Sequence, residues 1–161
     1  MALDLIAELE SIIDALADDG IEYAVCGGLA LGILGHPRMT KDIDLLILPG
    51  DVDRSLRIVK PLGYDIPARR MVFRAGGKTE QVMHRVSKLD PETNQLLPID
   101  FLLVTPVFED VWATRLVATY RERTIHVVSA DGLVTMKTLA NRPQDLADIA
   151  ALQRGPDDEE A

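Results

Sequence analysis

The hydrophobic positions of this 161-residue sequence repeat with two different periods. Spacings of three and four predict helices over residues 4–18, 29–34, 51–62, 106–116, 130–140 and 143–153. Short apolar runs predict strands over residues 21–26, 42–48, 97–104 and 124–128, and a hairpin with one strand around Phe73 and the other over 81–88. Because strands and helices alternate irregularly, we expect an α+β fold with a mixed β-sheet and flanking helices.

Length and composition indicate one domain over residues 1–154, followed by an acidic, frayed tail over 155–161. A hydrophobic content of 47% is sufficient for a buried core. No stretch approaches the roughly 18 apolar residues of a membrane span, and the N-terminus lacks the pattern of a secretory signal. We therefore expect a cytoplasmic protein without a membrane partner. The single cysteine, Cys26, excludes an intramolecular disulfide and is expected to pack in the core.

Charge is distributed unevenly along the chain. The net charge is −9, which argues against a protein that wraps nucleic acid over its whole surface. The segment from Arg54 to Lys88 nevertheless carries nine cations and two anions, so it is +7 while the remainder is −16. Two interpretations stay open: a solvated face that balances acidic neighbours, or a surface that receives phosphates beside an active site.

Three acidic residues lie in segments that otherwise predict buried strands. Asp42 and Asp44 are two positions apart, so a strand directs both carboxylates to the same face while Ile43 points into the core. Asp100 stands alone between apolar neighbours, and a buried carboxylate needs a partner. If the two strands are neighbours, the three carboxylates converge and could hold two metal ions about 3.5 to 4 Å apart. Mg²⁺ is the natural counter-ion because it prefers oxygen ligands.

A pair of glycines precedes the acidic strand. Gly27 and Gly28 stand between the predicted strand 21–26 and the predicted helix 29–34. Without Cβ atoms, their backbone N–H groups can approach a triphosphate, and the helix N-terminus adds partial positive charge. A glycine pair alone is usually only a turn, so its value lies in the order of elements: strand, Gly-Gly, helix, acidic strand, then a later strand with one acid.

This order of motifs resembles the nucleotidyltransferase superfamily with a polymerase-β-like palm. Its signature is an apolar residue, two small residues, a spacer, an Asp-apolar-Asp and a later lone Asp; the matching segments are Cys26-Gly27-Gly28, Asp42-Ile43-Asp44 and Ile99-Asp100-Phe101. The longer Arg38-Met39-Thr40-Lys41-Asp42-Ile43-Asp44 is similar to the R-x-T-x-D-x-D of the AbiEii-type subgroup. That subgroup is known for toxins of abortive-infection and toxin–antitoxin systems.

The resemblance implies a nucleotidyltransferase fold and transfer of a nucleoside monophosphate from an NTP, such as ATP, to RNA, a protein or a small molecule. It implies two Mg²⁺ ions, replaceable by Mn²⁺, on Asp42, Asp44 and Asp100. Nucleotide contacts would come from Gly27, Gly28, Arg38, Thr40 and Lys137. Lys137 would touch the triphosphate or the base, and Asp145 or Asp148, at i and i+3, would orient or deprotonate the acceptor. Gln144 stands where many relatives have Lys.

Two other functions remain open on the sequence. The chain could be a noncatalytic binding module that keeps the fold for contact with a partner, although retention of all three acids disfavours this. It could also be a metal-dependent nuclease, for which a Gly-Gly turn ahead of Asp-x-Asp is less natural. Because the chain is short for an enzyme that must hold a large acceptor, an antitoxin or a second copy could complete the site.

Overall fold

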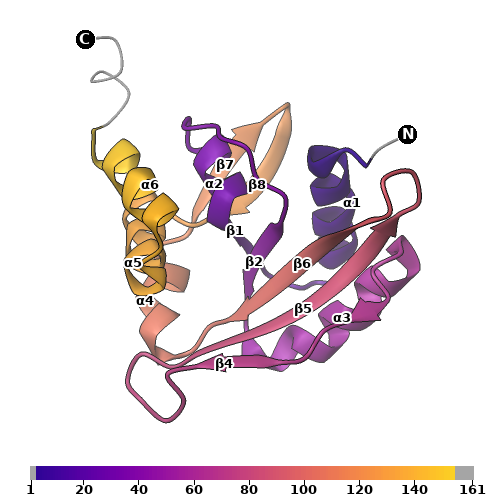
Figure 1. The fold of residues 1–161 in the computed structure, drawn as a ribbon, viewed down its shortest axis with the longest axis horizontal. Helices are drawn as coiled ribbons and strands as arrows, with labels where there is room; N and C mark the ends of the chain where they lie inside the picture. Colours follow the sequence, from indigo (N-terminus) through magenta and orange to yellow (C-terminus); the bar gives the residue numbers. More distant parts are fainter. Residues whose placement is uncertain (1–2, 155–161) are drawn as a thin grey trace.

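The computed structural model describes residues 3–154, which form a mixed β-sheet with helices packed on it (Figure 1). The helices are α1 (Leu5–Asp18), α2 (Gly27–Ile33), α3 (Val52–Val59), α4 (Glu109–Ala113), α5 (Ala130–Ala140) and α6 (Pro143–Arg154), with 3₁₀ turns η1 (Pro49–Asp51), η2 (Lys60–Leu62) and η3 (Pro106–Phe108). The strands are β1 (Ala24–Cys26), β2 (Ile43–Ile47), β3 (Ile66–Pro67), β4 (Met71–Phe73), β5 (Gln81–Asp90), β6 (Gln95–Leu103), β7 (Leu116–Tyr120) and β8 (Arg123–Val127).

The sheet has the strand order β3-β5-β6-β2-β1-β8-β7, and β4 pairs with β5 beside this path. The β2–β6 and β1–β8 pairs are parallel, and the other pairs are antiparallel. The prediction of an α+β fold with a mixed sheet is therefore confirmed. The predicted β4–β5 hairpin and the two C-terminal helices are also present.

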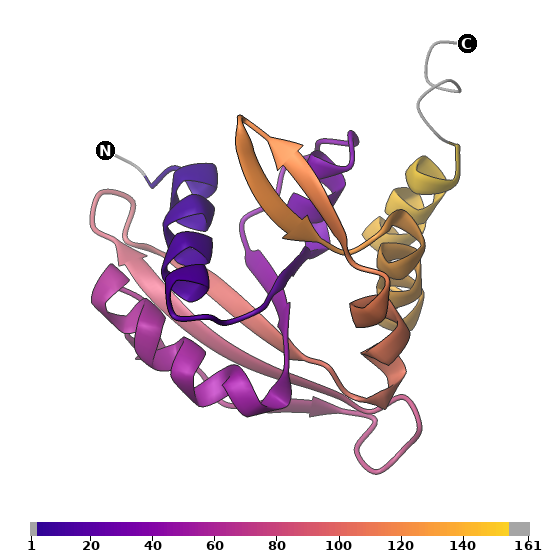
Figure 2. The ribbon, with the colours of Figure 1, turned by 180° about the vertical axis from the view of Figure 1, so that it is seen from behind.

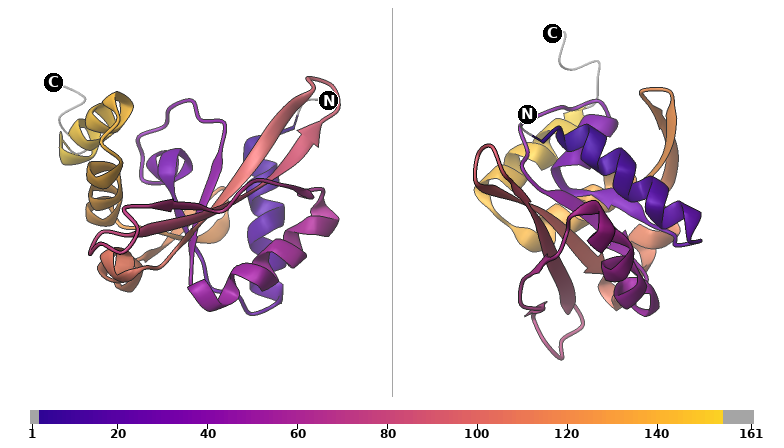
Figure 3. Two further views of the ribbon diagram at one scale, coloured as in Figure 1. Left: turned by 60° about the horizontal axis from the view of Figure 1, so that its bottom comes forward. Right: turned by 90° about the vertical axis from the view of Figure 1, so that its right-hand side faces the viewer.

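Helix α1 shows how the apolar spacing produces an element and its packing. Leu9, Ile12, Ile13 and Leu16 recur at helical spacing and are all buried. The Asp4 side chain caps the helix by accepting hydrogen bonds from the first free backbone N–H groups. Helices α1 and α3 contact each other and lie against the same face of β5 and β6 (Figures 2 and 3).

The centre of the sheet carries the most buried side chains. Ile43, Leu45 and Ile47 of β2 and Ile99 and Phe101 of β6 are almost completely inaccessible to solvent. Because the two strands are parallel and hydrogen-bonded along their length, their apolar side chains pack in register. This fixes β2 and β6 relative to each other, and with them any polar side chain that the two strands carry.

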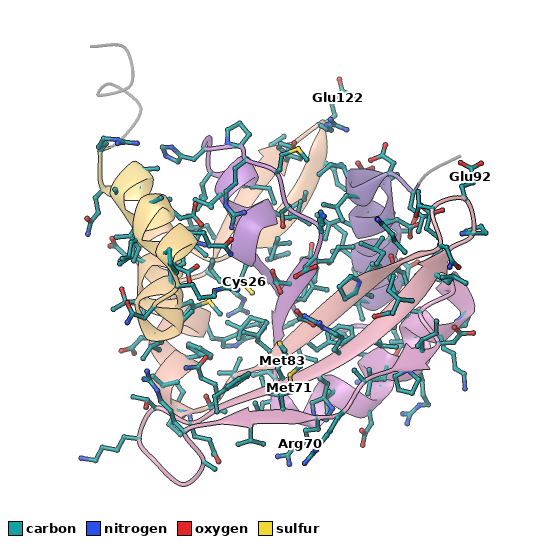
Figure 4. All side chains as sticks on the ribbon, viewed as in Figure 1. Cys26, Arg70, Met71, Met83, Glu92 and Glu122 are labelled. Carbon is teal, nitrogen blue, oxygen red and sulfur yellow. The ribbon has the colours of Figure 1, made fainter. Side chains whose placement is uncertain are left out.

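One predicted helix is shorter than expected. We predicted a helix over 106–116, but η3 and α4 end at Ala113, and Leu116 begins the unpredicted strand β7. Strand β7 pairs with β8 through a turn at Arg121 and Glu122, which both have positive φ, 51° and 65° (Figure 4). Hairpin turns of this kind usually contain Asn or Gly. The turn escaped prediction because neither residue is present.

The remaining differences concern segment ends. The two-residue strand β3 was not predicted, and the acidic tail proposed for 155–161 lies outside the described residues.

Across residues 3–154, no helix combines the length and apolar character needed to cross a membrane. The single cysteine, Cys26, is buried and free, as predicted.

Candidate active site

Asp44 and Asp100 occupy paired positions on neighbouring strands. The parallel register of β2 and β6 places Asp44 opposite Asp100 and Ile43 opposite Ile99. Both isoleucines are fully buried on the core side, so strand alternation directs the two carboxyl groups together to the opposite face. The late lone acid therefore lies beside Asp44, the second acid of the earlier pair.

Asp42 stands immediately before β2 and belongs to the same acidic cluster. Burial and the charge of Asp100 raise the pKa of the Asp42 carboxyl above its ordinary value. For Asp44, burial, the charges of Asp100 and Asp42, and a hydrogen bond with Asp100 raise the pKa to about 7. Burial disfavours the charged form of Asp44, and the neighbouring acids add to this effect, so a carboxyl that is normally ionised at neutral pH keeps its proton more readily here.

The two glycines lie beside this cluster at the junction of β1 and α2. Gly27 has a φ of 66°, and a Cβ at this position would overlap the Asp44 carboxylate. At Gly28 a Cβ would lie 2.7 Å from Thr40 Oγ1. The glycines were expected to make room for phosphates. In the structure their missing side chains first make room for Asp44 and Thr40, which pack against the start of α2.

Arg85 is a further residue of the cluster, and we did not single it out in the sequence. It lies on β5 opposite Asp100. Its Nε donates to Asp100 Oδ1 at 2.7 Å, and its second nitrogen donates to Oδ2 at 2.9 Å. These hydrogen bonds raise the pKa of the Arg85 guanidinium. The only signal in the sequence was membership of the basic segment, which does not distinguish Arg85 from its neighbours.

A second charged cluster joins α5, α6 and the loop before β2. The Nζ of Lys137 lies 2.7 Å from Asp148 and 3.5 Å from Asp145. Arg38 binds Asp148 at 3.0 Å, and Arg142 binds Asp145 at 2.8 Å. Lys137 and both aspartates are buried. The side chain of Lys137 and both carboxylates are thus engaged with each other, and the network carries three cations for two anions.

One cavity of about 940 Å³ connects the two clusters. All but one of the residues predicted for the site line it, namely Gly27, Gly28, Arg38, Thr40, Asp42, Asp44, Asp100, Lys137 and Asp145. The exception, Asp148, is attached to the wall through Lys137 and Arg38. Residues far apart in the sequence are therefore brought to one place.

Part of the cavity wall is apolar and was not predicted. Phe73 and Met83 contribute from β4 and β5, and Leu133 and Met136 contribute from α5. Met83 pairs with Met71 on the adjacent strand, and the two lie side by side below Cys26 in Figure 4. The cavity therefore has an acidic side near β2 and β6 and an apolar side between the β4–β5 hairpin and α5.

The comparisons with known proteins place the chain in a family. Residues 11–161 match the family described as "Nucleotidyl transferase AbiEii toxin, Type IV TA system". The chain belongs to this family. It is therefore a nucleotidyltransferase, in agreement with the resemblance of the Arg38–Asp44 motif. Comparison with curated proteins gave no match.

Solved structures share the fold of this nucleotidyltransferase at low sequence identity. The lincosamide antibiotic adenylyltransferase LnuA, with lincomycin bound, is 16% identical with a TM-score of 0.62; the match covers 95% of this chain and 98% of LnuA. A nucleotidyltransferase structure from Thermotoga maritima is 14% identical with a TM-score of 0.63, covering 92% of each chain. ANT(2")-Ia, in complex with adenylyl-2"-tobramycin, is 15% identical with a TM-score of 0.57, covering 92% and 87%.

The acidic cluster suits a divalent ion through its chemistry, although its side chains are not preassembled around one. Within residues 3–154, no three His, Cys, Asp or Glu side chains are grouped so that they could hold a metal ion. Buried Asp100 and half-buried Asp44 nevertheless form a pair of oxygen donors, and Mg²⁺ commonly binds one or two carboxylates together with substrate phosphates. Burial and then the charges of Asp100 and Asp42 raise the pKa of Asp44, and a bound cation would oppose this rise.

Proposed function

We propose that this nucleotidyltransferase binds an NTP with Mg²⁺ at the acidic side of the cavity and transfers its nucleoside monophosphate to an acceptor hydroxyl. The observation that carries the proposal is the register that pairs Asp44 with Asp100 directly beside the Gly27-Gly28 turn. The donor set proposed for the metal is Asp42, Asp44 and Asp100. When bound, two ions would neutralise triphosphate charge and make the acceptor hydroxyl more acidic.

The remaining steps, binding of the triphosphate and proton transfer, are assigned to residues of the chain. In this proposal the triphosphate is bound by the backbone N–H groups of Gly27 and Gly28, together with Arg38 and Thr40, which line the same cavity. Asp100 accepts the proton of the acceptor hydroxyl, and the hydroxyl oxygen forms a bond to the α-phosphorus of the NTP. The bond from that phosphorus to the bridging oxygen breaks, and pyrophosphate leaves. Positioning and charge neutralisation supply most of the catalysis in reactions of this class.

The network around Lys137 is proposed to position the nucleotide. Its excess of one positive charge faces the cavity, where it favours a triphosphate. Asp145 and Asp148 each accept hydrogen bonds from two cationic side chains, which favours a role in orienting these groups. Proton transfer by either carboxylate would first require one of these ion pairs to open.

For the acceptor we propose RNA, and we propose that the transfer is toxic to the cell, with an antitoxin or a second copy as a partner. Support comes from the family description and from the cationic side chains of Lys41, Arg74 and Arg142 on the cavity wall. A small molecule is the second candidate, because LnuA and ANT(2")-Ia, which share the fold, have antibiotics or their adenylylated products bound.

The proposal is tested with purified protein, Mg²⁺ and each α-labelled NTP. Wild type should bind nucleotide, and Asp44→Asn should not, whereas Asp65→Asn, at an exposed acid that does not line the cavity, should bind like wild type. Labelled or lengthened RNA supports RNA as the acceptor. Shortened RNA would indicate a nuclease, and equal binding of nucleotide and metal by wild type and Asp44→Asn would refute the proposed site.

A further inference from the structure

The Asp100 carboxylate is occupied on both of its oxygens by another side chain of the same protein. Arg85 reaches it from β5 with the two-pronged geometry that a guanidinium forms with a carboxylate. Asp100 is 4% exposed, while the side chain of Arg85 keeps 37% of its surface accessible on the cavity side. The buried acid is thus held by a cation that has room to move.

Asp100 lies between an acidic and a basic side chain. Strand β6 runs between β2 and β5, so Asp100 has Asp44 on one side and Arg85 on the other. A carboxylate offers about four lone-pair directions. Two are used by Arg85, and Asp44 lies opposite Asp100 on the neighbouring strand. Direct binding of a divalent ion to both acids therefore competes with Arg85 for the same oxygens.

The positive charge of Arg85 also repels a divalent ion at this site. A divalent ion between Asp44 and Asp100 would approach a guanidinium that never loses its charge. At about 5 Å, one unit of positive charge weakens the binding of such an ion about tenfold even at the dielectric constant of water. If Arg85 leaves Asp100, the favourable ion pair is lost, and a second anion must bind the guanidinium to offset this loss. The anion that the same cavity would receive is a triphosphate.

We propose that Arg85 is the resident counter-ion of Asp100 and is exchanged for the divalent ion when metal and nucleotide bind together. Released from Asp100, the guanidinium pairs with the phosphates, so it is a positioning residue whose movement couples the two ligands. Metal alone binds weakly because it must displace Arg85 without compensation. This inference rests on the proposed function, since it takes the acidic cluster as the metal site.

The test is a Mn²⁺ titration of the full chain, followed by the electron paramagnetic resonance signal of free Mn²⁺, with and without an α,β-methylene NTP. Wild type should bind Mn²⁺ weakly alone and much more tightly with nucleotide. Arg85→Ala should bind Mn²⁺ alone about tenfold more tightly than wild type, and nucleotide should then improve its affinity less. Arg85→Lys, a point charge without the fork, should lie between them.

The matched control is Arg74→Ala. It removes a cation from the same cavity wall, but Arg74 bonds to Thr79 and to the backbone of Leu139 instead of an acid. Its Mn²⁺ affinity should stay near that of wild type. Equal Mn²⁺ affinity in wild type, Arg85→Ala and Arg85→Lys would overturn the inference and assign Arg85 to structure alone. Retained Mn²⁺ binding in Asp44→Asn would instead overturn the proposed metal site, so the two failures are distinguishable.

Discussion

Asp44→Asn should make the metal-free protein more stable at alkaline pH, because the fold holds Asp44 in an unfavourable electrostatic position. Its pKa is raised from 3.8 to about 7 by burial and by the neighbouring acids. The folded state therefore keeps a proton that the unfolded state releases, and the stability of wild type falls as pH rises between about 4 and 7. About three pKa units correspond to about 4 kcal/mol. Asp44 is only half-buried, so screening by solvent reduces the expected gain to about 2 kcal/mol.

The measurement is urea unfolding with a chelator present, at pH 5 and at pH 8. Asn resembles the protonated acid, and unfolded Asp44 is already ionised at pH 5, so the stability advantage of the variant over wild type should be about 1 kcal/mol at pH 5 and about 2 kcal/mol at pH 8. Asp65→Asn, at an exposed position, should show no pH-dependent difference from wild type. The reasoning is refuted if the free-energy difference between Asp44→Asn and wild type is the same at both pH values.

Two further substitutions test the glycine turn and the buried network. Gly27→Ala should cost more stability than Gly35→Ala, because both positions have positive φ but only Gly27 also has Asp44 in the space of the new methyl group. Left-handed backbone alone costs roughly 1–2 kcal/mol, so equal losses in thermal or urea unfolding would show that the Asp44 contact is unimportant. Lys137→Met should lose about 2–3 kcal/mol because it leaves two buried carboxylates short of a cation. The exposed neighbour Thr138→Met should change little in the same assay, and a similar loss in both would contradict this account.

Much of the fold was accessible from the sequence because its central elements obey simple periodicities. Alternation around Asp42 and Asp44 and the apolar neighbours of Asp100 predicted strands with carboxyl groups on a common face, and the register of β2 and β6 places Asp44 and Asp100 in this way, while Asp42 stands just before β2. The Gly27-Gly28 junction was also located correctly. These features are local, so each can be recognised without knowing what the segment will pack against.

The missed features depend on pairings between distant segments. Arg85 looks like any other basic residue until β5 is placed beside β6, and the engagement of Lys137 by two aspartates becomes visible only when α5 and α6 pack. The β7–β8 hairpin was missed because positive φ at Arg121 and Glu122 is imposed by the surrounding structure against the usual residue preferences. Such tertiary effects leave no mark in a short stretch of sequence.

The position of the acids on interior strands also determines when the site forms during folding and when it is disrupted during unfolding. Strands β1, β2, β6 and β8 come from separate parts of the chain yet lie next to one another. Asp44 and Asp100 are separated by 56 positions in the sequence, so loop closure must precede their assembly. Backbone amides around Asp44 and Asp100 should accordingly exchange with deuterium only when the whole molecule opens. Catalytic competence in this enzyme would then rise and fall with global folding as a single unit.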